Sequence, residues 1–142
     1  MAVNLIDSTD ISVSQTGSDI QLNVSNDIKS QKPTTIWTGT LKGTENVVLS
    51  GVKNKLIIYA EANGANIVYT LDIYYGTTDR ASGMCWAYDT ASGLEFYCSE
   101  GSFVSSTNTF THTRTGYVNI GTGTYTARNS NNTYFVYKID TI

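Results

Sequence analysis

The sequence predicts an all-β protein, an antiparallel β-sandwich of jelly-roll-like type with a short N-terminal strand-containing extension. The first reason is residue usage. The 142 residues include 21 Thr, 14 Ser, 12 Asn and 10 Tyr, whereas only 15% are charged and one is proline. Thr and Tyr suit pleated, half-buried surfaces. The second reason is that short β-branched and aromatic runs alternate with Gly-containing turns, a spacing typical of sandwiches and barrels.

The first 30 residues differ from the rest, because they contain no aromatic residue and a single glycine, Gly17. Apolar and polar residues alternate over 11–14 and 20–25, which predicts two strands around a turn at 16–19. We therefore expect residues 1–30 to form an extension and residues 34–142 to form a sandwich head domain. The aliphatic side chains of the extension need a partner surface. This requirement predicts that the extension anchors the chain to another protein or exchanges strands between subunits.

The head domain is predicted to consist of short strands in sequence order. Lys55–Ala62 is a continuous apolar run of the kind found in central strands, and Asn63-Gly64 is a hairpin dipeptide. Polar loops are expected at 76–81 and 127–133. The remaining strands are expected at 36–41, 46–49, 67–75, 83–88, 94–99, 102–106, 109–115, 117–120 and 134–139.

Charge and hydropathy exclude several classes of function. The formal net charge is −3 and the isoelectric point is about 4.9, so no nucleic-acid partner is expected. No apolar run approaches the roughly 20 residues of a membrane-spanning helix. The N-terminus lacks the basic and apolar regions of a secretory signal. We therefore expect synthesis in a cytoplasm, with retention there or release by lysis, and no membrane insertion.

Catalytic candidates are scarce. His112 is the only histidine, and it lies among threonines with no nucleophile motif beside it. It is expected to be an exposed or hydroxyl-bonded strand residue. One histidine and two separated cysteines do not make a metal site, and no cofactor motif is present. The chain is predicted not to be an enzyme. A glycosidase-type pair among its twelve carboxylates stays an open alternative.

The two cysteines, Cys85 and Cys98, flank a predicted hairpin whose loop is Thr90-Ala91-Ser92-Gly93. With this four-residue loop, the residue numbers of two paired residues add up to 183, which places Cys85 opposite Cys98. Two interpretations follow. The thiols are free and buried, as is usual for a protein made in a cytosol, or they form a cross-strand disulfide after release.

Exposed aromatic residues are the main functional candidates. In the same predicted register Trp86 lies opposite Tyr97, with Tyr88 on their face. The other face is smaller and more core-like, and it carries Cys85, Ala87, Phe96 and Cys98. Tyr74 and Tyr75 are adjacent on a strand, so only one can face the core, and Tyr75 is taken as the outward one. We predict that Tyr75, Trp86, Tyr88 and Tyr97 contact a ligand, because Tyr and Trp favour recognition surfaces. The alternative is burial in the core or in a subunit interface.

A resemblance to a known module is carried by three segments: Ile36-Trp37-Thr38-Gly39-Thr40, Gly43-Thr44-Glu45-Asn46-Val47-Val48-Leu49 and Leu56-Ile57-Ile58-Tyr59. They resemble the C-terminal head module of tail-fibre, baseplate and head-fibre proteins of phages that infect Gram-positive bacteria. The match covers roughly residues 34–62. It implies a β-sandwich or jelly-roll head, a homotrimer, and a structural role for Trp37 and Gly39.

The resemblance implies a virion structural protein that presents a surface for attachment to a host receptor or glycan. Its location would be the virion, and its partners would be copies of itself, a host surface glycan or protein, and other virion proteins contacted through the extension. The alternatives are a stand-alone carbohydrate-binding, lectin-like domain, a small glycan-active enzyme, and an assembly protein without a receptor. A glycan array combined with the number of chains per particle would separate the first two functions.

Overall fold

The computed structural model is an all-β sandwich, as predicted. The structure describes residues 11–16, 19–24, 32–74, 76–89, 93–128 and 133–142, and the contacts divide the chain into two compact units, Met1–Pro33 and Thr34–Ile142. Within the first unit, β1 (Ile11–Thr16) and β2 (Asp19–Val24) form an antiparallel pair. Their register pairs Ile11 with Val24 and Val13 with Leu22, so apolar positions alternate with polar ones along this hairpin.

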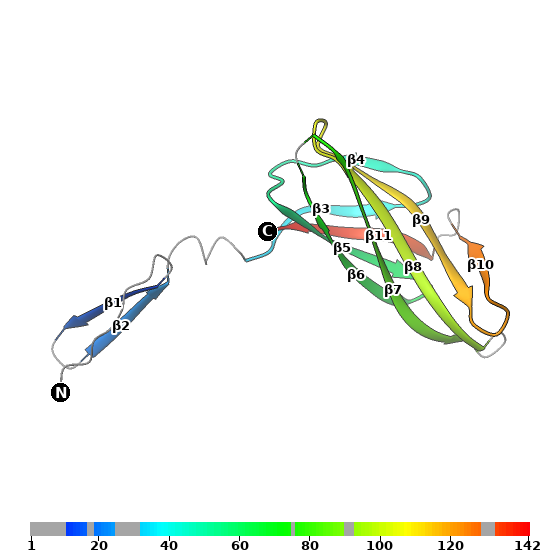
Figure 1. The fold of residues 1–142 in the computed structure, drawn as a ribbon, viewed down its shortest axis with the longest axis horizontal. Helices are drawn as coiled ribbons and strands as arrows, with labels where there is room; N and C mark the ends of the chain where they lie inside the picture. The colour runs from blue at the N-terminus through cyan, green and yellow to red at the C-terminus, as the bar shows by residue number, and fades with distance from the viewer. Residues whose placement is uncertain (1–10, 17–18, 25–31, 75, 90–92, 129–132) are drawn as a thin grey trace. The chain divides into compact units, whose positions relative to one another are not determined.

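The second unit consists of two antiparallel sheets (Figure 1). The longer sheet has the strand order β10-β9-β8-β7, with β4 pairing to the far end of β9. Its strands are β4 (Asn46–Val48), β7 (Thr78–Asp89), β8 (Gly93–Val104), β9 (Thr109–Asn119) and β10 (Thr124–Ala127).

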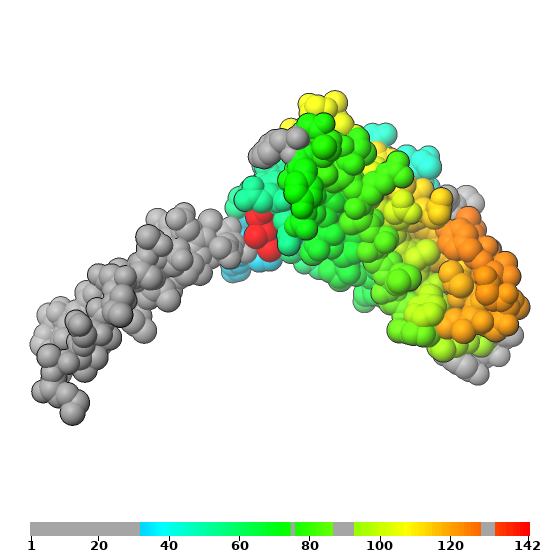
Figure 2. Space-filling model, in the orientation of Figure 1, coloured from blue at the N-terminus to red at the C-terminus, as the bar shows by residue number. Residues whose placement is uncertain are grey.

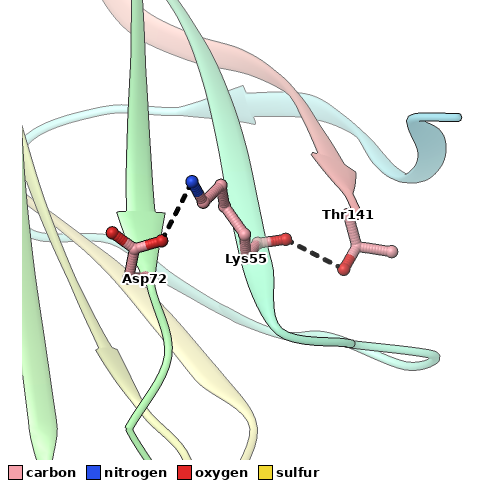
Figure 3. Close-up of polar contacts among 3 residues, drawn as sticks. All are labelled: Lys55, Asp72 and Thr141. Carbon is pink, nitrogen blue, oxygen red and sulfur yellow. Dashed lines mark hydrogen bonds and ion pairs between the residues drawn. The ribbon is translucent and has the colours of Figure 1, made fainter. Parts of the chain in front are cut away.

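The shorter sheet has the order β3-β11-β5-β6. It contains β3 (Thr34–Leu41), β5 (Lys55–Ala62), β6 (Ala65–Asp72) and β11 (Tyr134–Thr141). The C-terminal strand is therefore internal to the sheet. At its end the Thr141 hydroxyl donates a hydrogen bond of 3.0 Å to the Lys55 carbonyl, and the Lys55 ammonium lies 3.1 Å from an Asp72 carboxylate oxygen (Figure 3).

The core lies between the two sheets and follows the alternation of the strands. In β5 every second residue is fully buried, beginning with Leu56 and Ile58. Phe103 of β8 and Phe110 of β9 are opposite each other in register and have no exposed surface. Aliphatic residues of one sheet thus meet aromatic residues of the other, which is the usual way two sheets bury their inner faces.

Several predicted strand boundaries are wrong. Residues 78–81, expected in a loop, belong to β7, and Thr124–Ala127 forms a strand that was not predicted. The expected breaks near 100 and 116 lie inside the continuous strands β8 and β9. The second of these strands instead contains a register shift at Thr113, so a β-bulge carries the irregularity without ending the strand.

Close packing around Gly101 gives a stability prediction. A Cβ at this position would lie 2.5 Å from Phe110 Cζ and 3.0 Å from the Tyr69 hydroxyl, inside the core. We expect Gly101→Ala to lower the free energy of unfolding by about 2 kcal/mol through overpacking. Gly121→Ala is the matched control, because its Cβ would meet nothing closer than 3.4 Å. Urea unfolding measures both, and equal midpoints for the two variants would contradict this packing.

Candidate functional site

The hairpin of β7 and β8 has a register one residue different from the predicted one. Gly93 has a positive φ of 84° and is already paired with Asp89, so the loop comprises three residues, 90–92, and not four. Paired positions therefore add up to 182, and Cys85 lies opposite Tyr97. A shift of one residue moves every side chain of the partner strand to the other face. The prediction that Cys85 faces Cys98 is wrong for this reason.

The corrected register creates a row of large side chains across the outer face of the longer sheet. Trp86 pairs with Phe96, Phe96 with Val118, and Val118 with Tyr125. The rings of Trp86 and Phe96 are in contact. Trp86 is 60% exposed, so it points outward as predicted. Its neighbour in the row, however, is Phe96, whereas Tyr97 was expected.

Further apolar residues extend this row on both sides. Met84 pairs with Cys98, and the backbone N–H of Ile120 donates to the Leu94 carbonyl. Met84 is 69% exposed, and Leu94 and Ile120 are more than 40% exposed. Figure 2 shows parts of β7, β8 and β10 together on one visible side of the domain. The apolar outer face is defined here by Met84, Trp86, Leu94, Phe96, Cys98, Val118, Ile120 and Tyr125.

Two polar groups of the apolar outer face are already hydrogen-bonded to the backbone. The Tyr125 hydroxyl donates to the Thr115 carbonyl at 3.2 Å, and the Cys98 thiol lies 3.5 Å from the Gly116 carbonyl. The ring of Tyr125 covers Gly116, where any Cβ would collide with it. The face therefore offers rings, methyl groups and sulfur to a partner and few free hydrogen-bonding groups.

Of the residues predicted to contact a ligand, only Trp86 is seen on this surface. Tyr97 is 3% exposed and lies on the inner face, so its predicted exposure is wrong. Tyr88 belongs to β7, but its side chain lies outside the described part of the structure, and so does the whole of Tyr75. A ligand-binding role for Tyr75, Trp86 and Tyr88 stays a prediction.

Tyr97 instead belongs to an aromatic cluster between the two sheets. Its ring centre is 6.1 Å from that of Tyr117 and 5.9 Å from that of Tyr134, in edge-to-face arrangements. Its hydroxyl accepts a hydrogen bond of 3.2 Å from the Asn63 amide. Burial raises the pKa of Tyr134 to about 12. The cluster is thus a packed, uncharged part of the core.

Ser99 and His112 form the contact that most resembles a catalytic pair. Ser99 Oγ lies 3.4 Å from His112 Nε2 and 3.5 Å from the Tyr69 hydroxyl. Both Ser99 and His112 have no exposed surface, so no substrate reaches the pair in this arrangement. The expectation that His112 is hydroxyl-bonded agrees with this contact, and the alternative that it is exposed is wrong.

The two residues of the Trp-x-Gly motif contact each other. A Cβ on Gly39 would lie 2.5 Å from Cζ2 of Trp37, so the indole ring packs directly over the glycine. Trp37 is also paired with Ile139 of β11. The contact gives the motif a structural explanation, because only glycine leaves room for the ring.

The outer face of the shorter sheet has a different character. Lys138 Nζ lies 2.8 Å from an Asp140 carboxylate oxygen and 4.2 Å from the centre of the Tyr59 ring. Burial acts to raise the pKa of Asp140, but the hydrogen bond from Lys138 and other polar neighbours outweigh it, so the pKa lies below its ordinary value. Charge and aromatic surface are therefore combined here, as they also are on the longer sheet where the Arg114 guanidinium lies 5.8 Å from the centre of the Tyr125 ring.

Sequence reasoning missed most of the apolar outer face. Phe96 was assigned to the core face by the incorrect register, and the strand that carries Tyr125 was not predicted. The available signal was Gly93, since a glycine closing a hairpin loop often adopts a positive φ and belongs to the paired region. Counting from a three-residue loop would have placed Phe96 and Cys98 on the face that Trp86 shares with Met84.

The described residues contain no group of three or more potential metal-ligating side chains and no helix long and apolar enough to cross a membrane. Comparisons with protein-family models, curated proteins and solved structures found no match. The function of the chain is therefore inferred from its own sequence and geometry.

The cysteine geometry predicts two free thiols. Cys85 and Cys98 occupy consecutive register positions, point to opposite faces, and are both free. Burial raises the pKa of each thiol, so thiolate formation is suppressed near pH 7. We expect the native protein, without reductant, to take up two alkylating groups, slowly at pH 7 and faster above pH 9. Intact-mass spectrometry measures this, and a mass increase of two hydrogens on reduction would contradict it.

The buried histidine predicts a pH-dependent stability. Burial lowers the pKa of His112 from 6.5 to about 4, although Glu45 and nearby backbone groups of Leu41 and Arg114 act in the opposite direction. As the pH falls from 6.5 to 4, the unfolded chain binds a proton that the folded chain does not. The free energy of unfolding should therefore fall by roughly 3 kcal/mol over this window.

His112→Gln keeps a polar side chain at this position and removes the titration. Urea unfolding at pH 7 and at pH 4.5 should show a smaller loss of stability in this variant than in the unmodified chain, even if the variant is less stable at both pH values. Equal losses in the two proteins would show that His112 does not contribute.

Proposed function

We propose that the chain is a structural protein of a phage that infects Gram-positive bacteria, a fibre, baseplate or head-fibre component that presents a surface for attachment to a host receptor or glycan. It acts by surface contact and not by catalysis. The observation that carries this proposal is the apolar outer face, a row of exposed rings and methyl groups on a rigid sheet. Such surfaces are typical of proteins whose role is association.

Two further features support the proposal. The separate β-hairpin unit of β1 and β2 precedes the head, as an anchoring or strand-exchanging element would. The Trp37–Gly39 contact gives a physical role to the motif on which the resemblance to phage head modules rests. Low charge also favours association, because charged side chains are a usual guard against contact between sheets.

The alternative is a stand-alone carbohydrate-binding domain. The exposed indole of Trp86 favours it, because an aromatic ring is a suitable surface for the apolar face of a sugar. A lectin of this type would bind glycans as a monomer. A fibre component would bind them, if at all, as an oligomer, and the resemblance implies a trimer. Glycan-array binding together with the mass in solution separates the two functions.

Two measurements test the proposal. Antibodies against the chain should label phage particles produced by the cells that encode it. Fluorescently labelled protein should adsorb to the host bacteria and compete with the phage for them. Protein that is abundant in the lysate but absent from particles would contradict a virion location.

The role of Trp86 in attachment is tested by substitution. If Trp86 contacts the receptor, Trp86→Ser should reduce adsorption to cells at least about tenfold, since an exposed aromatic anchor is lost. The mass in solution is measured alongside, because reduced adsorption at an unchanged mass assigns Trp86 to the receptor contact, whereas a lowered mass assigns it to contact between copies. Val68→Ser is the matched control, because Val68 is 55% exposed on β6 of the other sheet. Equal adsorption of both variants would place the receptor site elsewhere.

A further inference from the structure

The apolar outer face is arranged so that it matches a copy of itself. The sheet has four strands in the order β10-β9-β8-β7 where this face lies. A two-fold axis in the plane of contact, running along the strands between β8 and β9, would place β8 of one copy over β9 of the other. It would equally place β7 of one copy over β10 of the other. Each residue of one copy then faces a residue of the other copy that lies in the same row, on the strand at the same distance from the axis.

The rows are complementary under this operation. In the central row Trp86, at one end, would face Tyr125 at the other, and Phe96 would face Val118. In the next row Met84, the most exposed residue of the face, would lie over Ala127, which pairs with Gly116 in this row. Large side chains thus meet aromatic or small ones.

The neighbouring row carries the charges. Glu100 of β8 pairs with Arg114 of β9, and both are at outward register positions beside the apolar residues. Under the same two-fold axis Glu100 of each copy would face Arg114 of the other. The contact would therefore have an apolar centre and a pair of opposite charges at its rim, the usual organisation of a protein interface.

The chemistry of the face favours a protein surface over a saccharide. Of its three side chains with polar atoms, Tyr125 and Cys98 are already directed to backbone carbonyls and offer little to sugar hydroxyls, which leaves the single indole N–H of Trp86. Its five most exposed residues are 39% to 69% exposed, and they are Met84, Trp86, Leu94, Ile120 and Tyr125. Contiguous apolar residues exposed to this degree mark a surface that binds a partner.

From these matches we infer that two copies of this chain pack face to face through the apolar outer face, about a two-fold axis lying between β8 and β9. This inference does not depend on a virion location. It assigns Trp86 to contact between copies and leaves the outer face of the shorter sheet for other partners. Together with the implied trimer, a two-fold contact would give a hexamer, and without it a dimer.

The first test is the mass of the full chain in solution by light scattering at about 50 µM, a concentration well above the dissociation constant of a stable dimer. A dimer, at twice the 15.5-kDa chain mass, or a hexamer supports the inference. A monomer or a trimer overturns it. Trp86→Ser should weaken the two-fold association at least about 30-fold, as expected for a central aromatic anchor, and Val68→Ser should leave it unchanged.

The decisive test uses charge reversal in two separate chains. Glu100→Arg and Arg114→Glu each place like charges opposite each other in a symmetric pair, so each variant alone should lose the two-fold contact. In an equimolar mixture the chains become complementary, because each Glu then faces an Arg of the other chain. The like charges on neighbouring strands within each chain persist in the mixture, so any recovery must come from the contact between chains.

The expected result is that each folded variant has half the mass of the unmodified particle and that mixing restores the full mass. Circular dichroism shows that both variants are folded. A mixture that stays dissociated overturns the proposed arrangement. Loss of phage labelling or of cell adsorption would contradict the proposed function and leave these masses unaffected, so the two failures are distinguishable.

Discussion

The register between β7 and β8 is the constraint on which both faces of the longer sheet depend. Gly93 pairs with Asp89 at a positive φ, and this fixes a three-residue loop. With that loop Tyr97 points into the sandwich and Trp86 points away from it. A loop longer by one residue would exchange the faces of β8, bury Phe96 and expose Tyr97. One glycine at the end of a hairpin thus decides which aromatic residues make the core and which make a surface.

Between the sheets the same register gathers polar groups that sequence patterns usually place outside. Ser99, His112 and Thr115 have no exposed surface, and Glu95 is 3% exposed. For Ser99 the cost of burial is offset by two polar neighbours, because its hydroxyl lies 3.5 Å from the Tyr69 hydroxyl and 3.4 Å from Nε2 of His112. The abundance of Thr and Ser therefore serves the interior as well as the exposed strands.

The fold class was predictable from sequence, and the surface was predictable only in part. Alternation identified Lys55–Ala62 and the hairpin at Asn63-Gly64, because strong periodicity and a specific turn dipeptide act locally. The position of Trp86 on an outer face was also predictable, because alternate residues of one strand lie on the same face whatever the register with the next strand. The partners of Trp86 were not, because they depend on loop length, on the bulge at Thr113 and on the short strand β10. Those features reflect tertiary pairing, which a single strand does not encode.

The distribution of side chains over the two sheets carries a physical consequence. A few polar groups are buried among the aliphatic and aromatic residues of the core, while indole, thioether and aliphatic groups lie on the outer face of the longer sheet. In a monomer this face would stay in water. The chain would then lack the stabilisation of about 25 cal/mol that burial provides for each Å² of apolar surface. The shorter sheet shows that the fold does not require this arrangement, because its outer face carries Lys138 and Asp140 in ion-paired contact. The difference between the two outer faces thus comes from their side chains and not from the fold. A partner that covers one face and leaves the other in solvent explains it best.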